Sequence, residues 1–227
     1  MRVGYADNII HDCEFIRKAL IDNKKWTVLG QSYGGFCLTT YLSLAPQGLN
    51  GAIITGGLPP LVDDPDLVYK ATYKHVIAKN QKFYNSFPTD KAIVRQIVDY
   101  LENNSVKLTT GEILTARRFL QLGIYFGFTS TGRSMNTIHY LIEKAFVSAS
   151  PGKKLSYVFL RNIEAMLEFN INPIYAILHE PAYCQKRSAN WSAQKILDEF
   201  REFDLKNNPI FFTGEMVYPW MFDQYEA

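Results

Sequence analysis

A serine stands among glycines at residues 30–35, which read GQSYGG. Gly30, Ser32 and Gly34 satisfy the pattern G-x-S-x-G, in which a serine occupies a sharp turn between a strand and a helix with its hydroxyl exposed. Glycines, including the following Gly35, suit such a turn because the neighbouring backbone comes too close for a Cβ atom. The pattern predicts that Ser32 is a catalytic nucleophile. The alternative is a serine in a structural glycine-rich turn.

The segments on either side of Ser32 predict the strand and the helix that this turn requires. WTVLG (26–30) is short and apolar, as expected of a buried parallel strand. From Tyr33 the run YGGFCLTTYLSLAP reads as a helix, which Pro46 and Gly48 bring to an end. This context favours the nucleophile over the structural turn.

Two neighbouring segments extend this arrangement. An amphipathic helix is predicted over 5–22, and GAIITGG (51–57) predicts a second buried strand. The order helix, strand, helix, strand contains a βαβ unit, which implies a parallel sheet. Two strands alone leave unpaired edges, so we expect these residues to form part of a larger fold.

The helix that begins at Tyr33 can stabilise negative charge near Ser32. The positive end of its dipole favours a developing oxyanion, and the backbone N–H of Tyr33 is predicted to donate a hydrogen bond to it.

A serine nucleophile also needs a base and an acid, which follow the serine along the chain in this arrangement. His11 precedes Ser32, so it fails this test. A surface or packing role is expected for the other histidines, and no recognisable strand precedes three late aspartates. The histidines are His75, His139 and His179, and the aspartates are Asp198, Asp204 and Asp223. We identify no triad partner among these residues.

The rest of the chain is predicted to be mainly helical. Helical periodicity replaces the strand pattern after residue 61, so we expect a division into residues 1–61 and residues 62–227. One helix is expected to open at Asp64-Pro65, and the next has its apolar face at 93–101. Further helices are expected at 115–126, 134–147, 155–168, 172–184 and 191–203.

Composition excludes several classes of protein. Apolar residues make up 47% of the 227 residues, and 24 basic residues nearly balance 22 acidic ones, so neither a nucleic acid nor a membrane is an expected partner. Cys13, Cys37 and Cys184 lie far apart, which argues against a disulfide framework or a zinc site. With no signal-peptide pattern, a cytoplasmic location is expected. No metal or organic cofactor is implied, and the oligomeric state is left open.

Several motifs together resemble one family. GQSYGGFCLTTYLSLAPQGL, followed by ITGGLPPL, resembles the prolyl aminopeptidases (proline iminopeptidases), which are α/β-hydrolase serine peptidases with a helical cap. The resemblance implies the α/β class: a partial α/β-hydrolase fold with the nucleophile-elbow βαβ unit in 1–61, and a large α-helical cap domain in 62–227. It continues through LTARRFLQLG (114–123), LSYVFLRNIE (155–164), NPIYAILHEPAYCQ (172–185), NWSAQKI (190–196) and FFTGEMVYPWMF (211–222).

The resemblance implies release of an N-terminal residue, preferentially proline, from peptides through an acyl-enzyme, with Ser32 as nucleophile. The family also carries an HGGPG-type oxyanion loop and a DQRG-type segment before the serine, and the triad's Asp and His after the cap. This sequence lacks all of them, so we expect a chain truncated at both ends. Two alternatives remain: an esterase-like α/β-hydrolase, and a non-catalytic homologue that binds peptide N-termini.

Glu180 in LHEPAY and Glu215 in TGEMVYPW match the family's amine-binding glutamates. A protonated N-terminal proline offers two N–H donors that carboxylates can accept. A carboxylate in an aromatic-rich segment is costly without a cation to pair with. The alternative is that both are solvated or capping glutamates.

Arg117 and Arg118 suggest a substrate clamp. Adjacent residues of a helix point apart, however, so a solvated face is the expected role.

Overall fold

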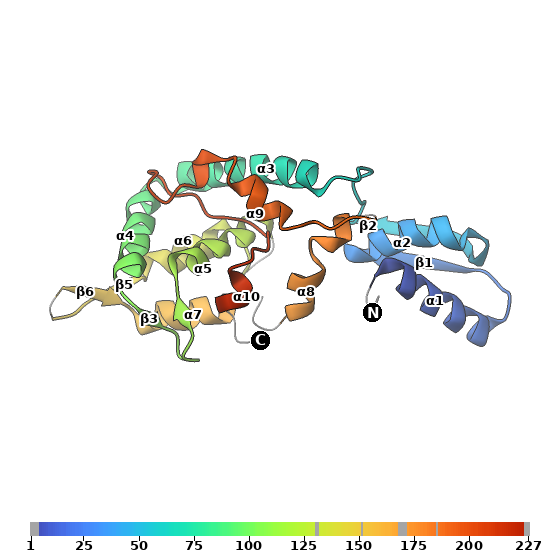
Figure 1. The fold of residues 1–227 in the computed structure, drawn as a ribbon. Coiled ribbons are helices and arrows are strands. Elements are labelled where there is room, and N and C mark those ends of the chain that lie inside the picture. Colours follow the sequence, from blue (N-terminus) through green and yellow to red (C-terminus); the bar gives the residue numbers. More distant parts are fainter. Residues whose placement is uncertain (1–4, 130–131, 151, 168–171, 185, 225–227) are drawn as a thin grey trace. The chain divides into compact units, whose positions relative to one another are not determined.

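The chain forms two compact units (Figure 1). Unit 1 extends to Asp64 and also contains Pro181–Ser188, whereas unit 2 contains Pro65–Glu180 and the residues from Ala189 onward. Each unit has its own hydrophobic core. The computed structural model describes residues 5–129, 132–150, 152–167, 172–184 and 186–224.

Unit 1 contains a two-stranded parallel sheet, whose register runs from Thr27 opposite Gly51 to Gln31 opposite Thr55. The order helix, strand, helix, strand is as predicted. The second strand begins two residues earlier than predicted and ends before Gly56, whose φ is +61°. The elements are α1 (Ala6–Ile21), β1 (Trp26–Gln31), α2 (Tyr33–Leu44), the 3₁₀ helix η1 (Pro46–Gly48), β2 (Leu49–Thr55) and, near residue 180, the 3₁₀ helix η4 (Pro181–Tyr183).

The two faces of this sheet differ. Val28 and Ile54 point to the face where α1 and α2 pack, and they contact a cluster centred on Ile10, Leu38 and Tyr41. On the opposite face Leu29 is 67% exposed and Ile53 is 51% exposed. Parallel sheets are normally covered on both faces, whereas in unit 1 helices cover one face and leave residues of the other exposed.

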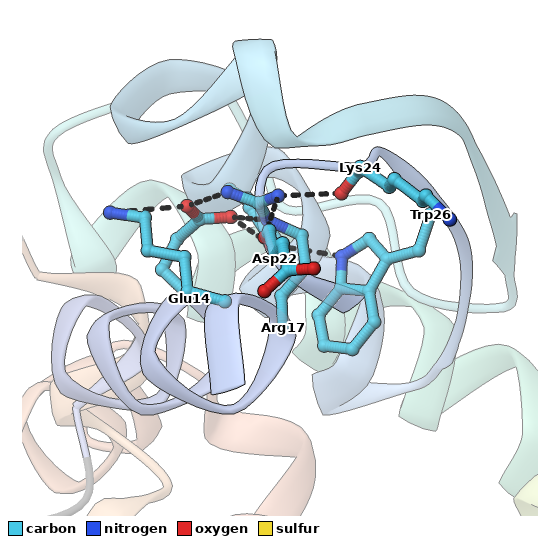
Figure 2. A network of polar contacts seen from close by, with 7 residues as sticks. Glu14, Arg17, Asp22, Lys24 and Trp26 are labelled. Carbon is cyan, nitrogen blue, oxygen red and sulfur yellow. Dashed lines mark hydrogen bonds and ion pairs between the residues drawn. The ribbon is translucent and has the colours of Figure 1, made fainter. Parts of the chain in front are cut away.

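A polar network joins α1 to the segment before β1 and to α2 (Figure 2). The buried Arg17 guanidinium donates to both carboxylate oxygens of Glu14 at 2.8 Å and to the Lys24 carbonyl at 2.6 Å. The Tyr41 hydroxyl donates to Glu14 at 2.5 Å and accepts from Trp26 Nε1 at 2.9 Å. The hydrogen bonds from Arg17 lower the pKa of Glu14 to about 2.

Unit 2 is mainly helical, with a core rich in aromatic rings that includes Phe83, Phe119, Phe126 and Phe212. The early elements are α3 (Pro65–Ser86), α4 (Asp90–Asn103), β3 (Val106–Lys107), β4 (Ile113–Leu114), α5 (Ala116–Leu120), the 3₁₀ helix η2 (Gln121–Gly127) and α6 (Met135–Glu143). The later ones are β5 (Phe146–Ser148), β6 (Lys153–Leu155), α7 (Tyr157–Met166), α8 (Pro173–Leu178), α9 (Ser192–Leu197), the 3₁₀ helix η5 (Arg201–Phe203) and α10 (Met221–Gln224).

Several predicted helices of unit 2 are shorter than expected. The prediction of helix over 134–147 is wrong at its end, because α6 stops at Glu143 and β5 pairs with β6 in an antiparallel hairpin. Gly152, which lies between the two strands with a φ of +85°, is a turn signal that sequence reasoning did not use. The helix predicted over 172–184 stops at Leu178, three residues before Pro181, because proline cannot continue a helix.

The interpretation of a solvated arginine pair is wrong for one of its members. Arg118 is 0% exposed, and it donates to the Ile113 carbonyl at 2.9 Å and to Glu112 at 3.0 Å. Arg117 is exposed. The two side chains therefore point apart, as adjacent residues of a helix should, but one of them points into the protein.

None of the described helices is both long and apolar enough to cross a membrane.

Candidate active site

Ser32 occupies the turn between β1 and α2. Its φ is +84° and its ψ is −111°, a backbone conformation that non-glycine residues rarely adopt and that typically costs about 1–3 kcal/mol. Two hydrogen bonds hold the turn: the Ser32 N–H donates to the Thr55 carbonyl at 3.3 Å, and the Gly35 N–H donates to the Ser32 carbonyl at 2.9 Å. Ser32 is exposed. Strained backbone, exposed serine and strand-to-helix placement together are the geometry of a nucleophile elbow.

Close backbone packing explains most of the glycines around this turn. A Cβ atom on Gly30 would lie 2.3 Å from the Gly34 carbonyl oxygen, and one on Gly35 would lie 2.0 Å from the Gly57 carbonyl oxygen. A Cβ atom on Gly34 would meet no atom within 4 Å. The expectation that crowding requires glycine is thus wrong for Gly34. Sequence reasoning missed Gly57, where a Cβ atom would lie 2.0 Å from the Ser32 carbonyl oxygen.

Tyr33 is the first residue of α2. From this position its backbone N–H is predicted to donate a hydrogen bond to the oxyanion. Its ring stacks on Phe36 with centroids 5.9 Å apart. Burial, followed by the nearby Cys37 and Asp7, raises the pKa of the Tyr33 hydroxyl. This hydroxyl therefore stays protonated at neutral pH, and the helix N-terminus carries the favourable electrostatics for an anion.

No described residue is hydrogen-bonded to the Ser32 hydroxyl as a base. His11, the histidine of unit 1, lies exposed on α1. In unit 2, His139 Nδ1 lies 2.9 Å from the buried Asp90 carboxylate, and its ring stacks on Phe87 at 4.0 Å. His11 thus has a surface position, and His139 is hydrogen-bonded to a buried carboxylate.

The other two histidines also belong to unit 2. His75 is exposed on α3. The His179 ring lies tilted against that of Tyr175, with centroids 4.9 Å apart, and burial lowers the pKa of His179 to about 4. A neutral ring against an aromatic neighbour is a packing arrangement.

Glu180 binds the N-terminus of α9. It is 5% exposed, and its two carboxylate oxygens accept from the Ala193 N–H at 2.7 Å and from the Ser192 N–H at 3.2 Å. Burial raises its pKa, although these two hydrogen bonds act in the opposite direction. The Ser192 hydroxyl donates to Asp66, which also pairs with Lys195 Nζ at 2.5 Å. Glu180 thus makes the contacts of a capping glutamate, the alternative considered from the sequence.

Glu215 has different surroundings. Its side chain is exposed, yet the protein atoms around the carboxyl displace enough water to raise its pKa. Within the described part of the chain, no hydrogen-bond donor or cation contacts this carboxylate. It therefore keeps its full capacity to accept hydrogen bonds from a cation, whereas Glu180 already accepts two.

Sequence reasoning missed the hydrogen bonds that hold the surroundings of Glu180, which involve Ser192, Ala193 and Asp66. Asp66 and Ser192 are 126 positions apart in the chain, so only the folded structure brings them together. Ser192, the first residue of the short helix α9, was a local signal of an N-terminal turn, but its partners Asp66 and Glu180 gave no such signal.

Comparisons with known proteins agree with this geometry. Residues 3–112 match the model of the alpha/beta hydrolase fold family. A proline iminopeptidase of Aeromonas sobria is 40% identical over 221 residues, which is 97% of this chain and 50% of that protein. A proline iminopeptidase of Aspergillus aculeatus is 35% identical over 229 residues, again 97% of this chain and 50% of that protein. The chain spans about half the length of the curated relatives that it matches.

Proposed function

We propose that this chain, which belongs to the α/β-hydrolase family and is related to proline iminopeptidases over 97% of its length, provides the nucleophile of a serine aminopeptidase. The proposed reaction releases proline from the N-terminus of peptides. The observation that carries the proposal is the backbone of Ser32, held at a φ of +84° between a parallel strand and a helix.

In the proposed reaction, Ser32 Oγ attacks the carbonyl carbon of the N-terminal proline. The bond to the next residue breaks, and its nitrogen leaves with a proton as the new N-terminus of the shortened peptide. Water then hydrolyses the acyl ester, which frees proline and restores the serine. The N–H of Tyr33 is proposed to bind the oxyanion of each step. Over the first step, the proton that Ser32 Oγ loses is balanced by the proton that the leaving nitrogen gains.

Glu180 and Glu215 are proposed to bind the protonated amine of the substrate. Two observations support unequal roles: Glu180 is buried and anchored by two backbone N–H groups, whereas Glu215 is exposed and has no described partner. Substitution of Glu180 would also disturb α9, so Glu215 is the cleaner position for a test. A blocked N-terminus would lose binding because a neutral amide cannot pair with the carboxylates.

The test is hydrolysis of proline linked to a chromogenic amine, measured with the protein expressed from its complete reading frame. We expect turnover that Ser32→Ala reduces at least about 10⁴-fold, as is typical for loss of a serine nucleophile. Turnover that persists in Ser32→Ala would overturn the assignment of the nucleophile. Absence of turnover in the unaltered protein would favour the non-catalytic homologue.

Glu215→Gln distinguishes the aminopeptidase from an esterase. We expect KM for the unblocked prolyl substrate to rise about tenfold with a smaller change in kcat, because a charge-assisted hydrogen bond is lost. The matched control is Glu143→Gln, an exposed glutamate at the end of α6. Equal cleavage of the N-acetylated substrate would contradict amine recognition. The cytoplasmic location expected from the sequence stays a prediction.

A further inference from the structure

Unit 2 contains a cavity of about 360 Å³ that the proposed peptidase does not use. It is lined by residues of α5, α9 and η5, of the turn between α9 and η5, and of the segment 204–220. None of them is Ser32, Glu180 or Glu215. Its volume lies within the range of about 300–1,000 Å³ that is typical of sites for small molecules.

Half-buried aromatic rings form the apolar walls of this cavity: Phe200, Phe203, Phe211 and Trp220. Buried Tyr73 supports the first two from behind, with ring centroids 5.4 Å from Phe200 and 5.3 Å from Phe203. The walls are therefore held in place by other parts of the unit and suit a large apolar group.

Tyr73 is itself fixed by two hydrogen bonds. Its hydroxyl donates to the Ala193 carbonyl at 2.8 Å and lies 2.9 Å from the Tyr218 hydroxyl. The Tyr218 ring in turn stacks on Trp220 with centroids 5.9 Å apart. The support thus connects α3, α9 and the segment before α10, and the site is formed before any ligand arrives.

Two arginines add positive charge to the lining. Arg117 on α5 and Arg201 on η5 are both exposed, and neither guanidinium has an ion-pair or hydrogen-bond partner within the described ranges. Neighbouring Arg118 differs, since its guanidinium is buried and paired with Glu112. A planar guanidinium matches a carboxylate through two parallel hydrogen bonds, so these two arginines suit a carboxylate.

Two aspartates add an equal negative charge. Asp198 accepts from Gln194 Nε2 at 3.0 Å, and Asp204 accepts from the Lys206 backbone N–H at 2.9 Å, each through Oδ1. Neither forms an ion pair with a described cation. Their remaining oxygens can accept hydrogen bonds from an ammonium group. The lining is therefore neutral overall, with separate cationic and anionic groups.

We propose that this cavity binds a free amino acid with a large apolar side chain. The carboxylate would pair with Arg117 and Arg201, the ammonium group with Asp198 and Asp204, and the side chain would pack against the aromatic walls. A ligand with one charge would satisfy one pair of residues and be repelled by the other. The zwitterion alone satisfies both pairs.

The experiment is isothermal titration of the full chain with L-phenylalanine, 3-phenylpropanoate and 2-phenylethylamine. The last two share the ring but lack the ammonium group and the carboxylate, respectively. We expect saturable binding of L-phenylalanine about tenfold tighter than that of either analogue, the usual loss for a missing charge-assisted hydrogen bond. Equal affinities or no saturable binding would overturn the proposal. Tighter binding of L-alanyl-L-phenylalanine would also overturn it, in favour of a short peptide.

Variants of the lining test the assignment of each charge. Arg201→Gln should weaken L-phenylalanine about tenfold and 2-phenylethylamine little, and Asp198→Asn should weaken L-phenylalanine while leaving 3-phenylpropanoate unchanged or tighter. Lys153→Gln is the matched control, because Lys153 is an exposed residue of β6 outside the cavity lining. Circular dichroism confirms that each variant is folded. Unchanged affinity in both folded variants would contradict the proposal, whatever the fate of the proposed peptidase activity.

Discussion

The two units reach stability by different means. In unit 2 a cluster of 24 buried residues, counted over the described part of the chain, brings several helices and two hairpins around one aromatic core. In unit 1 the corresponding cluster has six buried residues, and an ion-paired network joins the helices to the strand. The elbow thus belongs to the unit with the smaller core. Strained backbone persists only where the surrounding structure holds it, so changes in unit 1 should affect the turn at Ser32 more than changes in unit 2 do.

The largest expected effect is in the core of unit 2. Phe212 is 0% exposed, and its ring lies 5.2–5.8 Å from those of Phe83, Phe119 and Phe126. Phe212→Ala should lower the free energy of unfolding of unit 2 by about 3–5 kcal/mol, because it removes buried surface and leaves a cavity. Hydrogen exchange measured by mass spectrometry on unit 2 peptides gives this value.

Tyr157, which is 69% exposed on α7, provides the control. Tyr157→Ala should change the same free energy by no more than about 0.5 kcal/mol. Equal losses in the two variants would show that the aromatic core does not stabilise unit 2 in the way described.

A slightly smaller effect is expected from breaking the network of unit 1. Glu14→Ala should destabilise unit 1 by about 3 kcal/mol, because it leaves the buried Arg17 charge without its partner. This is the lower end of the usual range, since Arg17 keeps its hydrogen bond to the Lys24 carbonyl. Hydrogen exchange over residues 6–31 measures it. The control is Lys18→Ala, since Lys18 is exposed and lies 4.0 Å from Glu14. A loss in the control as large as in Glu14→Ala would show that general charge, rather than the network, is responsible.

Acid should affect both units through carboxylates whose pKa is lowered on folding: Glu14 in unit 1, and Glu164 and Asp66 in unit 2. The pKa of Glu14 is lowered to about 2 by Arg17, and that of Glu164 in unit 2 to about 2, chiefly by the hydrogen bond from Thr109. A carboxyl whose pKa is lowered on folding stabilises the protein above its unfolded value, and this contribution is lost as the pH falls from about 4.5 to about 2. We expect unit 1 to unfold at the higher pH, because its core is smaller.

An acid titration followed by hydrogen exchange tests this. Glu14→Gln should remove the pH dependence of unit 1 between pH 4.5 and pH 2 and leave that of unit 2. Glu164→Gln should reduce the pH dependence of unit 2 without removing it, because Asp66 keeps its own contribution, and should leave that of unit 1. The same dependence of unit 1 in Glu14→Gln and the unaltered chain would contradict the assignment.

The glycines of the elbow should differ in a way that the sequence does not reveal. Gly35→Ala should destabilise unit 1 by about 1–3 kcal/mol, because the added Cβ atom would meet the Gly57 carbonyl oxygen at 2.0 Å. Gly34→Ala should leave stability unchanged or raise it by up to about 1 kcal/mol, since the added methyl group meets open space and alanine favours the helix. Thermal unfolding of the two variants compares them directly. Equal losses would show that both positions are crowded.

This contrast shows what the sequence could predict. The strand, the turn at Ser32 and the helix after it follow from local patterns, so the prediction of these elements is confirmed. The prediction that the strand is buried is wrong for one of its faces, where Leu29 is 67% exposed. Contacts between distant residues leave no such pattern. Asp90 pairs with His139 across 49 positions, and Gly57 approaches Ser32 from the end of the neighbouring strand. Arg118 reads as a surface residue because its burial depends on contacts with the β3–β4 hairpin, for which the sequence carries no local pattern that we identified.

The smallest expected effect separates the polar network of unit 1 from its packing. The Tyr41 hydroxyl donates to Glu14 and accepts from Trp26, and burial followed by the bond to Glu14 raises its pKa to about 12. Tyr41→Phe keeps the buried ring and removes both hydrogen bonds, so we expect a loss of about 1 kcal/mol, measured by hydrogen exchange over residues 6–31. If the network organises the unit, Tyr41→Phe combined with Glu14→Ala should cost less than the sum of the single changes, because they share one interaction. Strict additivity would mean that the ring alone matters, and unit 1 would then be stabilised by packing, as unit 2 is.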